Sequence, residues 1–475
     1  MPASPIETPP SPPRIFRPPS PPRPEGPLGP LAFLYGMWRN PLSTWSRQSF
    51  ELPFIQAEGV MGRVAVLNEP AAIKRVFVDN VANYRKDALQ LRVLQPGLGH
   101  GLLTAEGDEW KAQRRALAPL FTPRLVDSFE PAMVECATWL DERWAPLRDG
   151  RRLDVSAEMS RVTLEVLQRT IFPAGLKRDP ADFARAMSRY FDSIGQIHPF
   201  DAMGLPAWTP RIGKRDTKRE LAFFAEAIAA IVGERRASMT REGAAPTRDL
   251  LGMLLAARDP QTGEGLGEHE INANILTFIG AGHETTAAAL TWSLYLLSQR
   301  PEWRREVEVE VDDVLGEGLR SPVPVDKLTK TQATFEEALR LYPPAATLSR
   351  EAIGPDTIGD RAIRAGDTVI VSPWVVQRHK LLWERPDEFL PERFMPGERE
   401  KIDRYAYIPF GAGPRVCIGM GFAMREAIIL LASILRGHRF DPAPGHKVEP
   451  VQRITTRPKG GMPMIARRRV ANEHA

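Results

Sequence analysis

The chain has only two cysteines, Cys136 and Cys417, among its 475 residues. Two cysteines so far apart in sequence do not suggest a disulfide framework and are typical of a reducing compartment, so at least one thiol is free for other chemistry. No stretch approaches the ~20 consecutive apolar residues that span a bilayer, and the N-terminus lacks the basic and apolar regions of a secretory signal. We therefore expect a cytoplasmic protein with no membrane span.

A strong net charge and an extreme composition are also missing. The chain carries 63 Lys and Arg residues against 59 Asp and Glu residues, and its formal net charge of +4 argues against a general affinity for nucleic acid. Hydrophobic residues make up 43% and charged residues 26%, as in ordinary globular proteins. The composition therefore predicts a folded body with a sizeable core.

Proline, by contrast, is abundant, with 45 residues. It dominates residues 1–30, where it favours extended conformations and leaves little to bury. We predict a disordered proline-rich leader over residues 1–30 and a single large domain over residues 31–475, because no repeat and no linker divides the rest. The early apolar stretch from Leu31 to Trp38 is expected to pack on the fold, and the alternative is weak contact with a membrane surface.

Hydrophobic periodicity after the leader predicts a mainly α-helical fold with a small β portion. Residues 62–67 have the composition of a strand, and residues 69–79 have a helical pattern. Residues 267–299 predict one long, mostly apolar helix, which ends where Pro301 can begin the next helix. A helix this long and apolar must run through the core. Residues 358–371 return to a strand pattern with glycine turns.

Cys417 lies in a glycine-rich stretch that starts at Phe410, directly before a helical run that begins at Met420. Glycines let the backbone fold closely around the sulfur, and amide N–H groups near a helix start stabilise a thiolate. A hydrogen-bonded thiolate is a strong ligand for iron. For an isolated buried cysteine, however, an inert core thiol is the default interpretation.

Residues 410–419, with the sequence FGAGPRVCIG, resemble the haem-ligand signature of the cytochrome P450 family, FxxGxRxCxG, at every specified position. The resemblance implies that Cys417 is the axial ligand of haem b. It also implies haem contacts for the flanking residues: Phe410 near the sulfur, Arg415 at a propionate, and Gly411 and Gly419 where the backbone approaches the porphyrin. Thiolate ligation donates electron density to the iron and favours O–O cleavage.

The long helix is interrupted at residues 280–286 by the sequence GAGHETT. Taken alone, such a stretch predicts a helix kink with a solvated glutamate. It resembles the distal-helix signature of the same family, (A/G)Gx(D/E)T(T/S), throughout. That resemblance implies that Glu284 and Thr285 are catalytic and deliver protons during oxygen activation, and that Ala281 and Gly282 lie against the haem.

Three residues in the C-terminal part of the chain match structural elements of the family. Glu337 and Arg340 are three apart on a predicted helix and fit the ExxR element, while Arg393 belongs to a PERF element. Most pairs with this spacing are surface salt bridges that contribute little. The resemblance instead implies a triad that supports the fold and takes no part in catalysis.

Further haem contacts are implied in other parts of the chain. Trp110 and Arg114 resemble the WxxxR helix that holds a propionate, and Arg350 and His379 occupy positions where the family often has additional propionate contacts. Three basic residues are candidates for a surface that docks an acidic electron-transfer protein, with ordinary solvated charge as an equal alternative: Lys111, Arg115 and Arg124.

The resemblance covers residues from about 31 to 465 and implies a triangular cytochrome P450 domain with haem between the long helix and the cysteine loop. The implied reaction is hydroxylation or epoxidation of a small apolar substrate by O2. We expect a monomer that receives two electrons from a separate ferredoxin or flavodoxin with its NAD(P)H-dependent reductase. A haem-thiolate isomerase or dehydratase and a non-catalytic haem sensor are the alternatives, and the Glu284-Thr285 pair argues against both.

The sequence does not identify the substrate. By resemblance the pocket lies in residues 91–105 and 183–235, which carry no motif. Five apolar residues of the second stretch have a helical spacing that fits an access region and core packing equally well: Phe183, Met187, Tyr190, Phe191 and Ile194.

Overall fold

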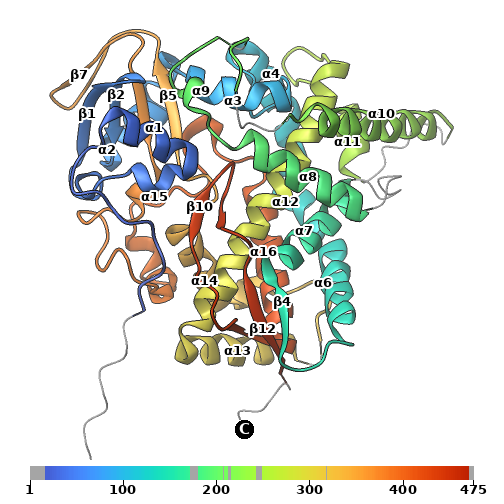
Figure 1. The fold of residues 1–475 in the computed structure, drawn as a ribbon. Coiled ribbons are helices and arrows are strands. Elements are labelled where there is room, and N and C mark those ends of the chain that lie inside the picture. Colours follow the sequence, from blue (N-terminus) through green and yellow to red (C-terminus); the bar gives the residue numbers. More distant parts are fainter. Residues whose placement is uncertain are drawn as a thin grey trace, which may run out of the picture.

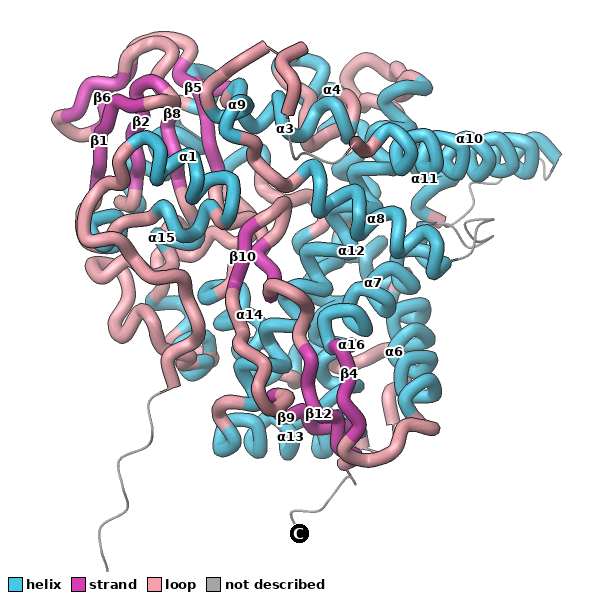
Figure 2. The backbone as a smooth tube through the Cα atoms, viewed as in Figure 1, coloured by secondary structure: helices cyan, strands magenta, loops and turns pink. Residues whose placement is uncertain are grey.

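The protein is described by a computed structural model that covers residues 16–171, 180–206, 208–211, 216–241, 249–316 and 318–469. Helices form most of the body, and strands gather in two places, beside the N-terminal segment and near the C-terminal end (Figures 1 and 2). This architecture is the expected single large domain of mainly α structure with a smaller β portion.

The elements follow the order expected from the sequence. The α-helices of the described residues are α1 (Pro30–Arg39), α2 (Pro70–Lys74), α3 (Ala88–Leu98), α4 (Gly107–Leu117), α5 (Pro123–Ser128), α6 (Glu130–Trp144), α7 (Val155–Ile171), α8 (Pro180–Ile194), α9 (Pro199–Ala202), α10 (Lys218–Arg241), α11 (Leu250–Ala256), α12 (Glu268–Ser298), α13 (Pro301–Leu315), α14 (Thr329–Leu341), α15 (Pro373–Val376) and α16 (Met420–Gly437). The strands are β1 (Phe54–Gly59), β2 (Gly62–Leu67), β3 (Tyr84–Arg85), β4 (Arg151–Asp154), β5 (Leu348–Ala352), β6 (Asp356–Ile358), β7 (Arg361–Ile363), β8 (Thr368–Val371), β9 (His438–Pro442), β10 (Pro450–Gln452), β11 (Thr456–Pro458) and β12 (Pro463–Arg468).

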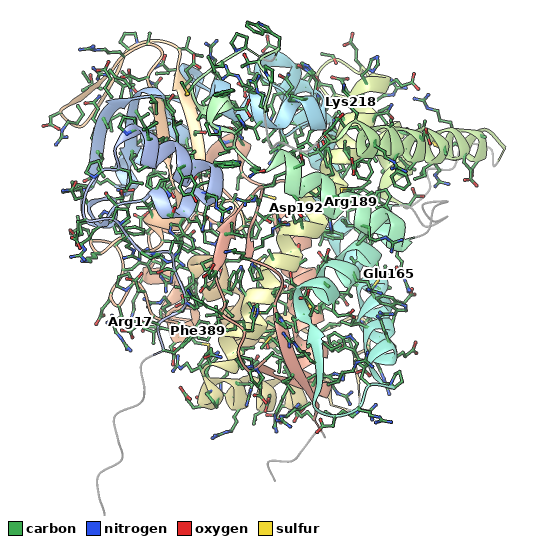
Figure 3. The ribbon with its side chains drawn as sticks, in the orientation of Figure 1. Arg17, Glu165, Arg189, Asp192, Lys218 and Phe389 are labelled. Atoms are coloured by element: carbon green, nitrogen blue, oxygen red, sulfur yellow. The ribbon has the colours of Figure 1, made fainter. Side chains whose placement is uncertain are left out.

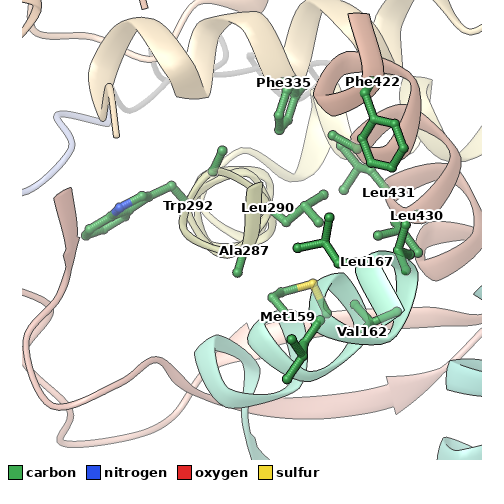
Figure 4. Packing of buried hydrophobic residues seen from close by; sticks show 14 of the residues in the cluster. Met159, Val162, Leu167, Ala287, Leu290, Trp292, Phe335, Phe422, Leu430 and Leu431 are labelled. Carbon is green, nitrogen blue, oxygen red and sulfur yellow. The ribbon is translucent and has the colours of Figure 1, made fainter. Parts of the chain in front are cut away.

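The long helix α12 crosses the core, as its apolar sequence predicts. Its first turn is closed by Glu270, whose carboxylate accepts a hydrogen bond of 2.7 Å from the Gly267 amide. Around it pack α7, α14 and α16, and Figure 4 shows Leu290 and Trp292 on different sides of the helix among their buried neighbours. The helix is therefore held on several sides, which fixes the position of the residues it carries.

The larger sheet joins two segments that are far apart in the sequence. Its strand order is β1-β2-β8-β5-β3, and β2 pairs in parallel with β8, so that Val64 lies opposite Thr368. Figure 1 shows the blue N-terminal strands beside the orange ones. A second sheet has the order β4-β12-β9. The sheets thus tie both ends of the domain to the helical body.

The expectation of a disordered leader over residues 1–30 is wrong for the part that the structure describes. Phe16 packs edge-on against Tyr295 with a centroid distance of 6.2 Å, and the Tyr342 hydroxyl donates a 2.8 Å hydrogen bond to the Pro19 carbonyl. Arg23 pairs with Asp387. Proline removes donors but leaves carbonyls, and these contacts use both the carbonyls and the few large side chains. Residues 1–15 lie outside the described residues.

The apolar stretch from Leu31 to Trp38 forms most of α1. Leu34 is buried as expected, whereas Leu31 is 84% exposed and Tyr35 is 59% exposed, so only one side of this helix packs on the fold. Among the described residues, no helix has the length and apolar character needed to cross a membrane.

Candidate functional site

The loop before α16 is shaped by close backbone packing. The Cys417 amide donates a 2.9 Å hydrogen bond to the Phe410 carbonyl, which closes the loop. Gly411 and Gly413 have φ angles of +78° and +71°, and a Cβ atom on Gly413 would lie 1.8 Å from the Phe77 carbonyl oxygen. No other residue fits at position 413, because both the left-handed conformation and the contact with Phe77 exclude a side chain.

The two cysteines occupy very different environments. Cys136 is fully buried in the core, and burial raises the pKa of its thiol far above the ordinary value. Cys417 is accessible, although it is set deep among protein atoms. Burial raises the pKa of the Cys417 thiol, while the Gly419 amide, which donates to the sulfur, and the charge of Arg114 act in the opposite direction. Cys417 is therefore the cysteine that can reach a ligand.

Several cations gather around Glu106 and Trp110. Arg415 lies on the face of Trp110, with its guanidinium 4.1 Å from the ring centroid, and its Nη2 is 2.9 Å from Oε1 of Glu106. Lys86 is 3.6 Å from the same oxygen. Burial lowers the pKa of Lys86 to about 7 and that of Arg350 to about 10. These groups thus carry more positive charge than the partly exposed carboxylate of Glu106 can balance.

Arg114 and Arg350 complete this group of cations. Burial lowers the pKa of Arg114, which makes no ion pair with a carboxylate in the described ranges. Arg350 donates a 2.7 Å hydrogen bond to the Ser349 carbonyl and lies over the Phe77 ring at 4.7 Å. The charge of Asp87 acts on Arg350 from a distance. Unbalanced buried cations are expensive unless an anion approaches them, so the cluster is suited to an anionic group.

The predicted haem contact of His379 does not fit its surroundings. The ring Nε2 lies 3.1 Å from the Leu52 carbonyl oxygen, and Nδ1 accepts a hydrogen bond from the Leu381 amide. Because both ring nitrogens are bonded to the main chain, neither is left for a propionate. The sequence position alone did not show this local turn.

A second group of predicted site residues lies on α12. The Thr285 hydroxyl donates to the carbonyl of Ala281 one turn earlier, and Ala281 is itself exposed. Gly282 does not share that face, because a Cβ atom there would lie 3.1 Å from Leu167 of α7. The small size of Gly282 lets α12 and α7 approach closely, and its predicted haem contact stays a prediction.

Glu284 is a nearly buried carboxyl group with incomplete hydrogen bonding. Its Oε1 accepts a 2.8 Å hydrogen bond from the Thr455 hydroxyl, while its Oε2 is buried with no partner among the described residues. Burial raises the pKa of Glu284 to about 7, and the bond from Thr455 opposes this rise. A carboxyl group with this pKa can both release and take up a proton near neutral pH.

Glu337 and Arg340 form a fully buried ion pair. The Nε and Nη2 atoms of Arg340 lie 2.6 Å and 2.8 Å from the two carboxylate oxygens of Glu337. Arg340 also donates to three main-chain carbonyls, those of Gln377, Pro386 and Glu388. Arg393 approaches the same glutamate at 3.4 Å, so the structure brings together all three residues that the sequence grouped.

Comparison with known proteins agrees with this arrangement. Residues 19–464 match the sequence model of the cytochrome P450 family. The chain belongs to the cytochrome P450 family. It is similar to cyclooctatin synthase of Streptomyces melanosporofaciens, with 34% identity over 80% of this chain and 81% of that protein. It is also similar to cyclooctat-9-en-7-ol 5-monooxygenase of the same organism, at 30% identity over 87% and 88%, and to a cytokinin hydroxylase of Arabidopsis thaliana, at 31% identity over 89% and 82%.

Membership makes the protein an oxidoreductase of the haem monooxygenase type, with haem b as its cofactor and a thiolate as the iron ligand. The residues of this cytochrome P450 fit that group. Cys417 is an accessible thiol, and the excess of buried cations matches the two carboxylates of haem b. At Gly419 an added Cβ atom would meet the protein only at Phe121, 3.9 Å away, so the protein itself does not require glycine there.

The structure adds residues that the sequence did not single out. Lys86 and Glu106 join the cation cluster although neither belongs to a recognisable motif. Glu426 of α16 is fully buried beside Thr286, and burial raises its pKa well above the ordinary value. Only its position nine residues after Cys417 could have drawn attention to it, and that spacing has no meaning without the fold.

The remaining predicted residues divide between packing and the surface. Lys111 bonds to Asp108 at 2.8 Å, and Arg115 pairs with Asp259, so these two charges are already engaged. Arg124 is exposed. Five apolar residues of α8 are buried in the main core, which favours packing over an access region: Phe183, Met187, Tyr190, Phe191 and Ile194.

Proposed function

We propose that this cytochrome P450 hydroxylates or epoxidises a small apolar substrate, with Cys417 as the axial ligand and Glu284 and Thr285 as the proton-delivering residues. Two observations support the proposal: Cys417 is an accessible thiol, and α12 carries a half-satisfied carboxyl group beside a hydroxyl. Haem b with a thiolate ligand, when bound, activates O2, because the sulfur donates electron density that favours O–O cleavage.

The cations would hold the cofactor through its propionates. Arg114, Arg415 and Arg350 were proposed from the sequence, and Lys86 is added from its position beside Glu106. Arg415 is the best oriented of them, because Trp110 and Glu106 fix its guanidinium from two sides. A propionate near these groups would relieve the burial of unbalanced charge, which supports this set of ligands.

Proton delivery would use two residues of α12 in turn. The Thr285 hydroxyl now donates to the Ala281 carbonyl, and rotation about its χ1 bond would let it donate elsewhere. Glu284 is one residue earlier and has a pKa of about 7, so it can supply a proton and regain it from solvent. The pair thus supports oxygen-dependent chemistry over an isomerase, a dehydratase or a haem sensor.

The substrate proposal rests on the relatives. The names of two of them refer to cyclooctatin and to cyclooctat-9-en-7-ol. We therefore take cyclooctat-9-en-7-ol as the first compound to test, followed by other terpenoids, fatty acids and aromatic compounds. Electrons would come from a separate ferredoxin or flavodoxin and its reductase, and Lys111 and Arg124 are the exposed cations of the predicted docking surface.

A single-turnover experiment tests the reaction class. The haem-loaded protein is reduced chemically to the ferrous state, then mixed with O2, a compound that changes its ferric spin state, and a reduced ferredoxin or flavodoxin that supplies the second electron, and the product is compared with the O2 consumed. Oxygenated product supports the proposal. A product that is isomerised or dehydrated without O2 uptake, or a reduced protein that never oxidises any compound, contradicts it.

Matched threonine variants test the role of Thr285. Thr285 and Thr291 both lie on α12, and each hydroxyl donates to a carbonyl one turn earlier. T285A should lower the yield of product per O2 by about tenfold or more, as expected for loss of a proton donor, with peroxide released instead. T291A should leave that ratio unchanged. Equal yields from the two variants would contradict the role of Thr285.

The ligand itself is tested without turnover. C417S should still fold, because the hydroxyl is similar in size, but it should lose the absorption spectrum of thiolate-ligated haem. C136S serves as the control, because Cys136 is enclosed in the apolar core. A thiolate spectrum that survives in C417S would exclude Cys417 as the ligand.

A further inference from the structure

The turn that joins β10 to β11 lies beside Glu284 of α12, and the Thr455 hydroxyl of this turn donates a hydrogen bond to it. The indole Nε1 of Trp292 donates a 3.0 Å hydrogen bond to the Thr456 carbonyl, which ties this turn to the helix. A groove with a volume of about 1470 Å³ is lined by α7, α8, α12 and the β10–β11 segment, and Glu284 and Arg457 are among its lining residues. Solvent therefore has a path toward Glu284 that does not pass the cysteine loop.

Two carboxylates share one arginine at this place. Arg457 is ion-paired through Nη2 with Asp192 of α8, which is labelled in Figure 3. Its Nη1 lies 3.8 Å from Oε1 of Glu284, at the outer limit of an ion pair. The Asp192 side chain is 49% exposed and that of Glu284 is 13% exposed. Arg457 is thus closer to Asp192, whose charge is already solvated by water, than to the more buried Glu284.

We propose that Arg457 is a positioning residue that Asp192 and Glu284 share, and that the position of Asp192 decides whether Glu284 holds its proton. This inference rests on the proposed role of Glu284 as a proton donor. While Asp192 holds Arg457, Glu284 lacks a full counter-charge and keeps a proton. When Asp192 moves away with α8, Arg457 can turn fully to Glu284 and favour its anion.

Physical chemistry supports a large effect from a small movement. The interaction of two charges falls with distance and is far stronger where water is excluded, so a shift of Arg457 by an ångström or two changes the proton affinity of Glu284. Burial already lowers the pKa of Arg457, which means that its charge is poorly solvated and seeks an anion. An exposed carboxylate such as Asp192 can release it at little cost.

Two neighbouring groups, His283 and Arg453, do not compete for the interaction among Arg457, Asp192 and Glu284. His283 precedes Glu284, but its Nδ1 is 3.1 Å from the Ile279 carbonyl, and burial lowers its pKa to about 4, so it is neutral. Arg453 of the same turn donates to the carbonyls of Arg39 and Gln452. The other charged groups that line the groove belong to α1, β4, α7, α8 and the residues flanking β10 and β11: Arg39, Asp154, Arg161, Glu165, Arg185, Lys447, Glu449 and Lys459.

The test is the pKa of Glu284 in the full-length, haem-loaded protein at rest. It is read from the infrared band of the protonated carboxyl group, identified as the band that E284Q loses, during a pH titration. D192N should free Arg457 and lower the pKa of Glu284 by about one unit, whereas R457Q should raise it. T455V should also raise it, because the hydrogen bond from Thr455 lowers it now.

The two variants should therefore move the titration in opposite directions, which a general structural disturbance would not do. R453Q is the control from the same turn and should leave the pKa unchanged. Shifts of equal sign in D192N and R457Q, or no shift in either, would overturn the proposal.

This readout does not depend on turnover. If Glu284 is not a proton donor for the reaction, E284Q keeps its yield of product per O2 while the opposite pKa shifts remain. If the sharing of Arg457 is wrong, the shifts are absent while E284Q still loses yield. When both hold, the pH at which yield per O2 falls should move in the same direction as the pKa in each variant.

Discussion

Two glutamates of this cytochrome P450 lie close to arginines, and their surroundings differ completely. Glu337 receives two hydrogen bonds from Arg340, one of 2.8 Å from the Leu390 amide, and the charge of Arg393. Glu284 receives one hydrogen bond, from Thr455, and has an arginine at 3.8 Å. The carboxylate of Glu337 is fully engaged by its hydrogen-bond partners, whereas one oxygen of Glu284 has no partner among the described residues.

The difference shows how one residue type serves as scaffold or as catalyst. A buried charge that is fully paired is rigid, and its removal leaves the partners unsatisfied. A buried carboxyl group with a free oxygen has a raised pKa, and this property makes it useful near neutral pH. Each of the following variants alters one side of the comparison.

The largest effect is expected from R340A, which should destabilise the protein by about 3–5 kcal/mol because Glu337 and three main-chain carbonyls lose their donor. R340K keeps the charge but not the forked geometry, and should fall between R340A and the wild type. Urea unfolding followed by circular dichroism measures both.

The control for R340A is an exposed pair with the same spacing. Lys401 and Glu398 are three apart, and their side chains are 67% and 57% exposed. K401A should change the free energy of unfolding by less than about 1 kcal/mol. If R340A lost no more stability than K401A, the buried triad would not support the fold.

The second prediction concerns E284Q and the pH dependence of stability. The pKa of Glu284 is raised from 4.5 to about 7, so the folded protein binds a proton that the unfolded chain releases in this range. Its contribution to stability is complete below pH 4.5 and is lost as pH rises toward 7, by up to about 3 kcal/mol. The free energy of unfolding of the wild type should fall by this amount relative to that of E284Q as pH rises over this window. A constant difference between the two proteins would contradict the raised pKa.

Glu337→Gln should have a smaller effect. The glutamine keeps the shape and one acceptor oxygen, but it cannot accept both bonds from Arg340, which lowers stability by about 2 kcal/mol. The measurement is again urea unfolding, together with the amount of haem retained after purification. Wild-type stability in E337Q would mean that shape, and not charge, holds this region.

The smallest effect is expected from R393K. Arg393 lies 3.4 Å from Glu337 and donates weakly to the carbonyls of Glu384 and Arg385, so a lysine should cost about 1 kcal/mol. Thermal unfolding of R393K beside R340K makes this comparison. A loss larger than that of R340K would reverse the ranking of the two arginines.

Much of the fold could be predicted because its signals are local. The helix predicted over residues 267–299 is observed as α12, Glu268–Ser298, and Pro301 begins α13 as expected. The strand predicted over residues 62–67 is β2. The leader was missed because Phe16 and the Pro19 carbonyl find partners that are hundreds of residues away, and no local pattern reports such contacts.

The candidate site divides in the same way. Cys417, Glu284 and Thr285 lie in short motifs, and a motif can be read without the fold. Lys86 and Arg457 reach the site only through tertiary structure, one from the end of β3 and the other from β11. Sequence order also could not show that the ring of His379 is bonded to Leu52, or that Gly282 faces α7.

The parallel pairing of β2 with β8 sets the order of events during synthesis. The edge of β2 at Val64 can be covered only after Thr368 of β8, about 300 residues later in the chain, has been synthesised. Until then the β1–β2 hairpin exposes an open edge, and such non-local pairing makes folding slow and dependent on protection from aggregation. The cation cluster also draws on both halves of the chain, with Lys86 from the first and Arg415 from the second. The full set of cations around Glu106 can therefore form only after most of the chain has been synthesised.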